Sequence, residues 1–193
     1  MTELASDHAV KKRTPLKIAL IGMPAIGKTT IGRKLARCYG YAFVDLDHVI
    51  EERIGCSIRE YFECMGEPAF RDIEATVLAQ QVARAEPLVL STGGGIVLRP
   101  ENRAQLRCHC HVVYLHALPE ALLRRVRHDR TRPLLQVHDP LRRLQELYVT
   151  RHPLYLETAD VQVQADVGSM RQTLQTIERQ LASLGVPPPV ASG

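Results

Sequence analysis

Short apolar runs alternate along this chain with longer segments in which apolar residues recur every three or four positions. The first run, LKIALI at 16–21, lacks the apolar–polar alternation of a half-exposed strand, so it predicts a strand that is buried on both faces. Further short runs predict strands at 41–47, 87–92, 111–116 and 160–164. The pattern therefore predicts a sheet built from segments spread over most of the chain.

The segments between these strands have the spacing of amphipathic helices. They predict helices at 29–40, 47–55, 57–66, 67–85, 99–107, 119–128, 139–153 and 167–185. Pro153 is expected to end the helix that begins at 139, because a proline in a helix interior removes a backbone hydrogen bond. Strands that alternate with helices favour an α/β fold, with a parallel sheet covered on both faces and ligands at the carboxyl ends of the strands.

The composition is that of one ordinary globular domain. The 193 residues are 45% apolar and 24% charged, and no apolar run approaches the length of a membrane span. We expect disordered tails at 1–14 and 186–193 around a single domain at 15–185. The net charge of +4 is too mild to favour nucleic acid as a partner. The five irregularly spaced cysteines follow a polar N-terminus, which favours reduced cysteines and a cytoplasmic location.

The stretch GMPAIGKT at 22–29 fits the phosphate-loop pattern G-x-x-x-x-G-K-[ST]. It lies between a predicted strand and a predicted helix, where backbone N–H groups and the positive end of the helix can surround a polyphosphate. Lys28 is then expected to reach the β- and γ-phosphates, and Thr29 to bind Mg²⁺ through its hydroxyl. A chance glycine turn before a helix is the alternative. The predicted nucleotide-binding residues of this loop are Ala25, Ile26, Gly27, Lys28, Thr29 and Thr30.

Ala25 stands where many such loops have a third glycine. A positive φ at this position would cost alanine about 1–2 kcal/mol. We therefore expect either a negative φ at Ala25 or some backbone strain.

Asp45 and Asp47 close the second predicted strand, near the place where a bound triphosphate would lie. Two carboxylates at such a place suggest divided roles. One would hold water on Mg²⁺, and the other would accept the proton of an acceptor alcohol. For either residue, capping of the helix that follows is the alternative, and the two roles are compatible.

Two weaker features follow along the chain. Arg71 and Glu74 are three residues apart on one predicted helix face, where the guanidinium could capture a carboxylate and the glutamate could orient it. A surface ion pair is the simpler interpretation. Gly93, Gly94 and Gly95 follow a predicted strand, and such a run lets the backbone approach a ligand closely, although a plain tight turn is as consistent with it.

Arginines crowd a short polar segment at positions 124, 125, 127, 130 and 132. In a phosphoryl-transfer enzyme, such a segment can close over the nucleotide as a lid and bring an arginine to the developing charge. A solvated basic face and a nucleic-acid patch are the alternatives. No aromatic residue is interleaved for base stacking, which disfavours nucleic acid.

Together, these motifs resemble those of the shikimate kinase family. The matching stretches are GMPAIGKTTIGRKLA, FVDLDHVIE, GEPAFRDIE, STGGGIVL, RPLL and RHPLY, in the family's order. The resemblance implies a three-layer α/β/α phosphate-loop fold with a central five-stranded parallel sheet and an arginine-rich lid at about 124–138. It also implies transfer of the γ-phosphoryl of ATP, with Mg²⁺, to the 3-hydroxyl of shikimate, a step of aromatic amino-acid biosynthesis. Another small-molecule kinase of this fold, such as a gluconate kinase, is the alternative.

The resemblance implies a role for each matching residue. Asp47, Lys28 and Arg132 would be catalytic, with Asp47 as the proton acceptor. Arg132 would be the lid arginine that reaches the transferring phosphate of the nucleotide. The residues implied to bind shikimate are Asp47, Arg71, Glu74, Gly93, Gly94, Gly95 and Arg151.

The remaining implied roles concern the metal, the adenine and the partners. Thr29 and Asp45 would hold Mg²⁺. Arg125 would stack on adenine, although Arg124 and Arg127 compete for that role. We expect a monomer with shikimate as its partner and with neither nucleic acid nor a membrane, although the apolar face of the last helix is a possible dimer face.

Overall fold

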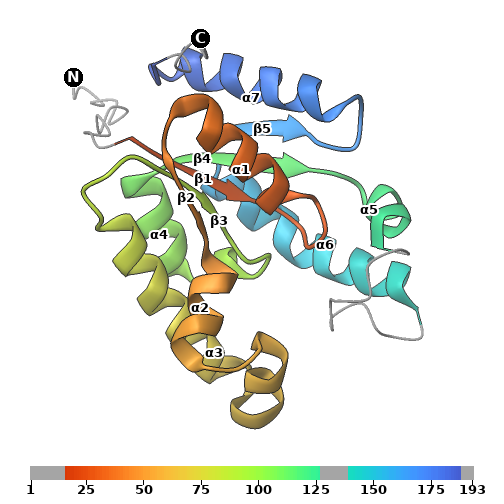
Figure 1. The fold of residues 1–193 in the computed structure, drawn as a ribbon. Coiled ribbons are helices and arrows are strands. Elements are labelled where there is room, and N and C mark those ends of the chain that lie inside the picture. The colour runs from red at the N-terminus through yellow and green to blue at the C-terminus, as the bar shows by residue number, and fades with distance from the viewer. Residues whose placement is uncertain (1–15, 127–138, 188–193) are drawn as a thin grey trace, which may run out of the picture.

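A computed structural model describes residues 16–126 and 139–187 of this chain. Its centre is a sheet of five parallel strands in the order β2-β3-β1-β4-β5 (Figure 1). The strands are β1 (Lys17–Ile21), β2 (Ala42–Asp45), β3 (Leu88–Ser91), β4 (His111–His116) and β5 (Val161–Gln164). Each lies inside a run that predicted a strand, so both the five strands and their parallel arrangement are confirmed.

Helices cover both faces of the sheet, which confirms the three-layer α/β/α arrangement. Figure 1 shows α1 and α7 on one face, and α4 and α6 on the other with α3 packed beside α4. The helices are α1 (Lys28–Tyr39), α2 (Leu46–Ile54), α3 (Ile58–Val82), α4 (Pro100–His109), α5 (Pro119–Val126), α6 (Pro140–Thr158) and α7 (Met170–Ser183), with a 3₁₀ turn at Ile96–Leu98. None of the helices described here is long and apolar enough to cross a membrane.

The core forms where the strands meet these helices. The central strand β1 is buried along its whole length, as its unbroken apolar run predicts. Ile177 and Leu181 bury one face of α7 against the sheet. The packed chain runs past Gly185, because Val186 is buried and its N–H donates to the Leu181 carbonyl.

Strand register places the sequence motifs at one edge of the sheet. Leu20 of β1 pairs with Ser91 of β3, and Ser91 pairs with Asp45 of β2. The phosphate loop, the glycine run and the second aspartate follow these three strand ends directly. Because the carboxyl ends of parallel strands meet at one edge, the three motifs lie close together.

Two predicted boundaries are wrong. β2 ends at Asp45 instead of Asp47, because the Asp45 carboxylate accepts a hydrogen bond from the Asp47 N–H at 3.2 Å and caps α2. α6 continues through Pro153 to Thr158. Pro153 is exposed, and so is Val149 one turn earlier, so water can replace the hydrogen bond that the proline removes.

The break within α3 is where the two predicted helices meet. Gly66 has φ 80° and ψ 169°, a conformation that only glycine adopts readily, and it separates the first part of α3 from the part that carries Arg71 and Glu74.

The five cysteines are free, in agreement with the expectation of reduced thiols.

Candidate active site

The phosphate loop wraps around the side chain of its own lysine. Lys28 is buried, and its Nζ donates to the carbonyls of Gly22 and Met23 at 2.9 Å each. α1 begins directly after Gly27, and no described side chain caps its first N–H groups. These N–H groups and the positive end of the helix dipole favour an anion, as expected for a nucleotide loop.

Ala25 has a φ of 64°, so the expectation of a negative φ is wrong and the alternative, backbone strain, applies. Among the residues that the structure describes, it is the one non-glycine residue with a positive φ. This conformation brings the Cβ close to the following carbonyl and costs about 1–2 kcal/mol. Strain of this kind recurs at ligand-binding loops.

Three oxygen-bearing side chains gather at the start of α1. The Thr29 hydroxyl donates to Asp45 Oδ2 at 2.7 Å and lies 3.4 Å from the Ser91 hydroxyl. Hydroxyl and carboxylate oxygens are the ligands that Mg²⁺ prefers, so this group fits the predicted metal. Asp45 also caps α2, so it can serve both structure and metal.

A pocket brings the phosphate loop, the start of α2 and the end of β3 together. Its lining consists of Ala25, Gly27, Lys28, Thr29, Thr30, Asp47, Ser91, Thr92 and Gly94. The predicted proton acceptor Asp47 therefore lies beside the predicted nucleotide loop. An acceptor hydroxyl and a terminal phosphate could meet here.

Ser91 and Thr92 are pocket residues that sequence reasoning missed. The Thr92 hydroxyl donates to the Leu20 carbonyl at 2.9 Å, which fixes the end of β3 to the end of β1. Their position directly before the glycine run was the available signal. Two hydroxyls at the carboxyl end of a buried strand are candidates for a ligand site.

Arg71 and Glu74 form a buried ion pair, so the simpler interpretation of a surface pair is wrong. The Arg71 guanidinium donates to Glu74 Oε2 at 2.8 Å and to Glu67 Oε1 at 2.9 Å, and the side chains of Arg71 and Glu74 are 11% and 1% exposed. Burial raises the pKa of Glu74, and Arg71 opposes that rise. Burial also acts to lower the pKa of Arg71, but Glu74 and Glu67 outweigh it and the pKa is raised. Arg71 is therefore a fixed positive charge.

The glycine run lets these side chains lie against the backbone. A Cβ on Gly95 would overlap the Arg71 guanidinium. A Cβ on Gly93 would lie 2.8 Å from Asp47 Oδ1 and 3.2 Å from Glu74 Oε1. The run is therefore more than a tight turn, because a larger residue would displace the predicted site residues.

Arg151 reaches the same region from α6. It is 6% exposed, and burial lowers its pKa, with repulsion from Arg71 acting in the same direction. The fold thus holds two guanidiniums close enough to repel each other. A bound carboxylate would relieve this repulsion and accept hydrogen bonds from both arginines.

Arg125 is the lid-segment arginine that the structure places against the phosphate loop. Its guanidinium donates to the Ile26 carbonyl at 2.9 Å and to the Ala165 carbonyl after β5, although the side chain, like that of Arg124, is exposed. Arg127, Arg132 and most of the predicted lid lie outside the described residues.

Comparisons with known proteins identify the family of this chain. The family model described as shikimate kinase matches residues 24–182 of this chain. The chain belongs to the shikimate kinase family. A shikimate kinase of Paracidovorax citrulli is 51% identical over 176 residues, which cover 90% of this chain and 96% of the relative. A shikimate kinase of Neisseria gonorrhoeae is 48% identical over 166 residues, covering 86% and 96%.

Solved structures of the family have the same fold. The shikimate kinase of Acinetobacter baumannii in complex with shikimate has a TM-score of 0.83 and 39% identity, covering 89% of this chain and 96% of that one. The shikimate kinase of Bacteroides thetaiotaomicron has a TM-score of 0.81 and 30% identity, covering 86% and 98%. A gluconokinase of Sinorhizobium meliloti, at TM-score 0.58 and 20% identity over 89% and 94%, shares the fold alone.

Proposed function

We propose that this protein transfers the γ-phosphoryl group of ATP to the 3-hydroxyl of shikimate, giving shikimate 3-phosphate and ADP. The observation that carries the proposal is that two buried guanidiniums, Arg71 and Arg151, lie near the glycine run, whose Gly94 lines a pocket with Asp47 and the phosphate loop. Such a site suits a substrate that carries both a carboxylate and a hydroxyl.

In this proposal, Arg71 and Arg151 bind the substrate carboxylate. Glu74 fixes the direction of Arg71 through their 2.8 Å contact. Gly93, Gly94 and Gly95 contribute backbone contacts to the substrate, and of the three Gly94 lines the pocket. The acid end of shikimate is thereby held, and a hydroxyl is directed toward Asp47.

The phosphate loop binds the nucleotide. Backbone N–H groups from Ala25 to Thr30 surround the phosphates, and Lys28 supplies a positive charge. Arg125 lies against the adenine. Its hydrogen bond to the Ile26 carbonyl holds the guanidinium beside the phosphate loop. Thr29 and Asp45 would hold Mg²⁺, which when bound neutralises negative charge on the phosphates.

Asp47 acts as the proton acceptor. It takes the proton of the 3-hydroxyl while that oxygen forms a bond to the γ-phosphorus. The bond from this phosphorus to the bridging oxygen breaks, and ADP leaves. Arg132, which the family resemblance assigns to the lid at about 124–138, would stabilise the charge that develops during transfer.

Release of ADP from Mg·ATP, with shikimate or gluconate as acceptor, tests the proposal. We expect stimulation by shikimate alone. Asp47→Ala should lower kcat by about 10²–10⁴-fold, and Arg71→Ala should raise the KM for shikimate by about 10–100-fold. Arg53→Ala is the matched control, because Arg53 is exposed on α2 and its guanidinium donates to the side-chain oxygen of Gln80 at 2.9 Å. Equal stimulation by gluconate, or none by either acid, would contradict the assignment.

We also propose that the protein works as a monomer in the cytoplasm, with 15–185 as one kinase domain and without nucleic acid. The large apolar side chains that the described surface exposes are scattered over several elements, among them Met65 on α3, Val149 on α6 and Leu184 after α7. Such scattering is ordinary for a monomer. Sedimentation at micromolar concentration should give the mass of one chain.

A further inference from the structure

Tyr155 of the RHPLY stretch is a buried residue to which neither the motif nor the proposed reaction has assigned a role. Its side chain is fully buried between α6 and the sheet. Its hydroxyl donates to the Gly94 carbonyl at 2.5 Å, a short bond across 61 residues of sequence. The bond ties α6 to the middle of the glycine run.

The same phenol oxygen also faces Arg151. Residues 151 and 155 are four apart in α6 and so lie on one helix face. Burial raises the pKa of Tyr155, and the neighbouring Arg151 guanidinium opposes that rise through charge and hydrogen bonding. Because a phenol has one proton and that proton goes to Gly94, its lone pairs are left to accept from Arg151.

Holding the Gly94 carbonyl also holds the Gly95 N–H, because both belong to one peptide group. A trans peptide is planar, so the Gly95 N–H must point away from the bond to Tyr155. Gly95 in turn lies against Arg71, and Gly94 lines the pocket. One hydroxyl therefore connects Arg151 with the backbone that supports Arg71.

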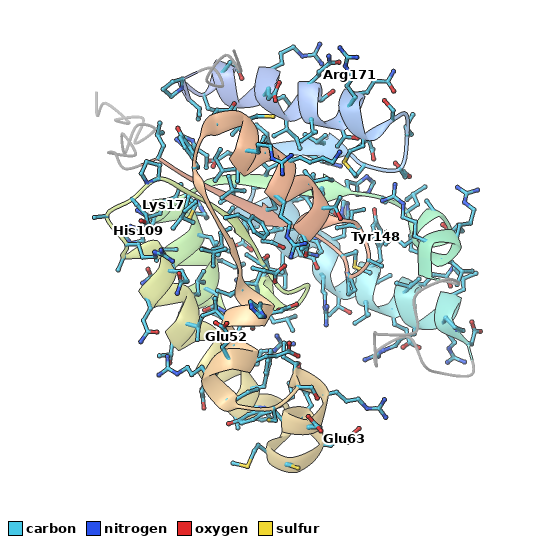
Figure 2. All side chains as sticks on the ribbon, in the orientation of Figure 1. Lys17, Glu52, Glu63, His109, Tyr148 and Arg171 are labelled. Carbon is cyan, nitrogen blue, oxygen red and sulfur yellow. The ribbon has the colours of Figure 1, made fainter. Side chains whose placement is uncertain are left out.

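The Tyr155 ring has little freedom to move. It stacks on Tyr114 of β4 with ring centroids 4.9 Å apart. The Tyr114 hydroxyl and His152 Nδ1 form a hydrogen bond of 2.9 Å. The His152 ring stacks on Tyr148 of α6, which Figure 2 labels, with ring centroids 4.6 Å apart. A ring clamped in this way fixes the direction of its hydroxyl.

We propose that Tyr155 is a positioning residue for the acid-binding half of the site, which sets Arg151 and the Gly94 backbone in the arrangement that receives the substrate carboxylate. This inference rests on the proposed function. A tyrosine that only filled the core would affect the free energy of unfolding and leave the two substrates' KM values in their original ratio. A positioning residue affects the acid substrate selectively.

The test is Tyr155→Phe, which keeps the ring and its stacking and removes the hydroxyl. We expect the KM for shikimate to rise about tenfold, as for loss of a hydrogen bond to a charged group. The KM for ATP and kcat should stay within about twofold, because the hydroxyl bonds to Gly94 and faces Arg151, and neither is a residue of the phosphate loop. The methyl ester of shikimate lacks the negative charge, so its weak turnover should be the same in wild type and variant.

Tyr39→Phe is the matched control. Tyr39 is also a buried tyrosine, and its hydroxyl has no hydrogen-bond partner among the described atoms. This variant should leave both KM values unchanged. If Tyr155→Phe is unfolded at the assay temperature, as judged by circular dichroism, the same comparison of KM values is made at a lower temperature at which the variant is folded.

The outcomes separate this inference from the proposed function. A wild-type protein without shikimate-dependent ADP release would overturn the proposed function, and the role of Tyr155 with it. An active wild type whose Tyr155→Phe variant keeps its KM for shikimate would overturn the role of Tyr155 alone. So would a variant in which the KM values for ATP and shikimate rise by the same factor.

Discussion

At the scale of single residues, Ala25 is held in a conformation that its side chain disfavours. Ala25→Gly removes the cost of about 1–2 kcal/mol of a positive φ, but it also frees the unfolded chain, which offsets about 0.4–1 kcal/mol. We expect a net gain of about 0.5–1 kcal/mol in the free energy of unfolding without ligand. Urea denaturation measures it.

A second alanine gives the control for Ala25→Gly. Ala104 lies in the ordinary helix α4 and is exposed. Ala104→Gly should destabilise the protein by about 1 kcal/mol, because glycine is a poor helix former. If both variants lose stability alike, the strain at Ala25 is not a significant cost.

Gly95 gives a second prediction, in which sterics act without backbone strain. Its φ is −96°, on the side of the Ramachandran map that is open to alanine, and the atoms nearest to an added Cβ are those of the Arg71 guanidinium. Gly95→Ala should displace Arg71 and lower kcat/KM for shikimate by about 10–100-fold, since small misplacements in a site are costly. Steady-state kinetics at saturating ATP measures this effect. An unchanged kcat/KM would mean that Arg71 can move aside without loss.

At the scale of elements, hydrophobic patterning was a good guide to where strands lie and a poor one to where they end. The buried strands are visible because both faces are covered, which leaves a run of apolar residues. The end of β2 depends on one side chain, Asp45, which turns the chain by capping α2. The continuation of α6 past Pro153 depends on exposure to water on that side of the helix. A local propensity cannot include either effect.

The contact between α6 and β4 should make stability depend on pH. Burial lowers the pKa of His152 from its usual 6.5, and the nearby His116 acts in the same direction. A group with a lowered pKa in the folded state binds its proton more readily when unfolded. The stability that depends on an uncharged His152 should therefore be complete above about pH 6.5. The free energy of unfolding should decrease as the pH falls through 6.5 toward the lower pKa of the folded state.

Urea denaturation at pH 7.5 and at lower pH, in wild type and His152→Gln, tests this dependence. Glutamine does not titrate, so the variant should lose less stability between the two pH values. The groups that face His152 are His116 and Tyr114 from β4 and Tyr148 from α6. The same pH dependence in both proteins would assign the loss to other groups.

At the scale of the whole molecule, the site is built from several segments of the chain. The sequence predicts the geometry within one contiguous segment better than the contacts between distant segments. The phosphate loop is one contiguous stretch, so its pattern carries its own geometry. Arg71 looked like a surface residue by spacing alone, because its burial depends on the distant glycine run. The bond between Tyr155 and Gly94 joins segments 61 residues apart and leaves no local signal. The resemblance to a family supplied what the spacing could not.

The two guanidiniums give a last prediction for the molecule as a whole. Arg71 and Arg151 repel each other when no anion lies between them. A bound carboxylate removes that cost in the folded state only, so shikimate should stabilise folding. At about 100 times its Kd, the gain is about 2.7 kcal/mol, or roughly 5–10 °C in Tm for a chain of this size.

Arg151→Gln should lose most of this shift and keep the shift caused by Mg·ATP, because the phosphate loop is unchanged. Thermal unfolding with each ligand separately makes the comparison. A full shikimate shift in Arg151→Gln would mean that Arg71 alone binds the acid and that the repulsion between the two arginines has no part in it.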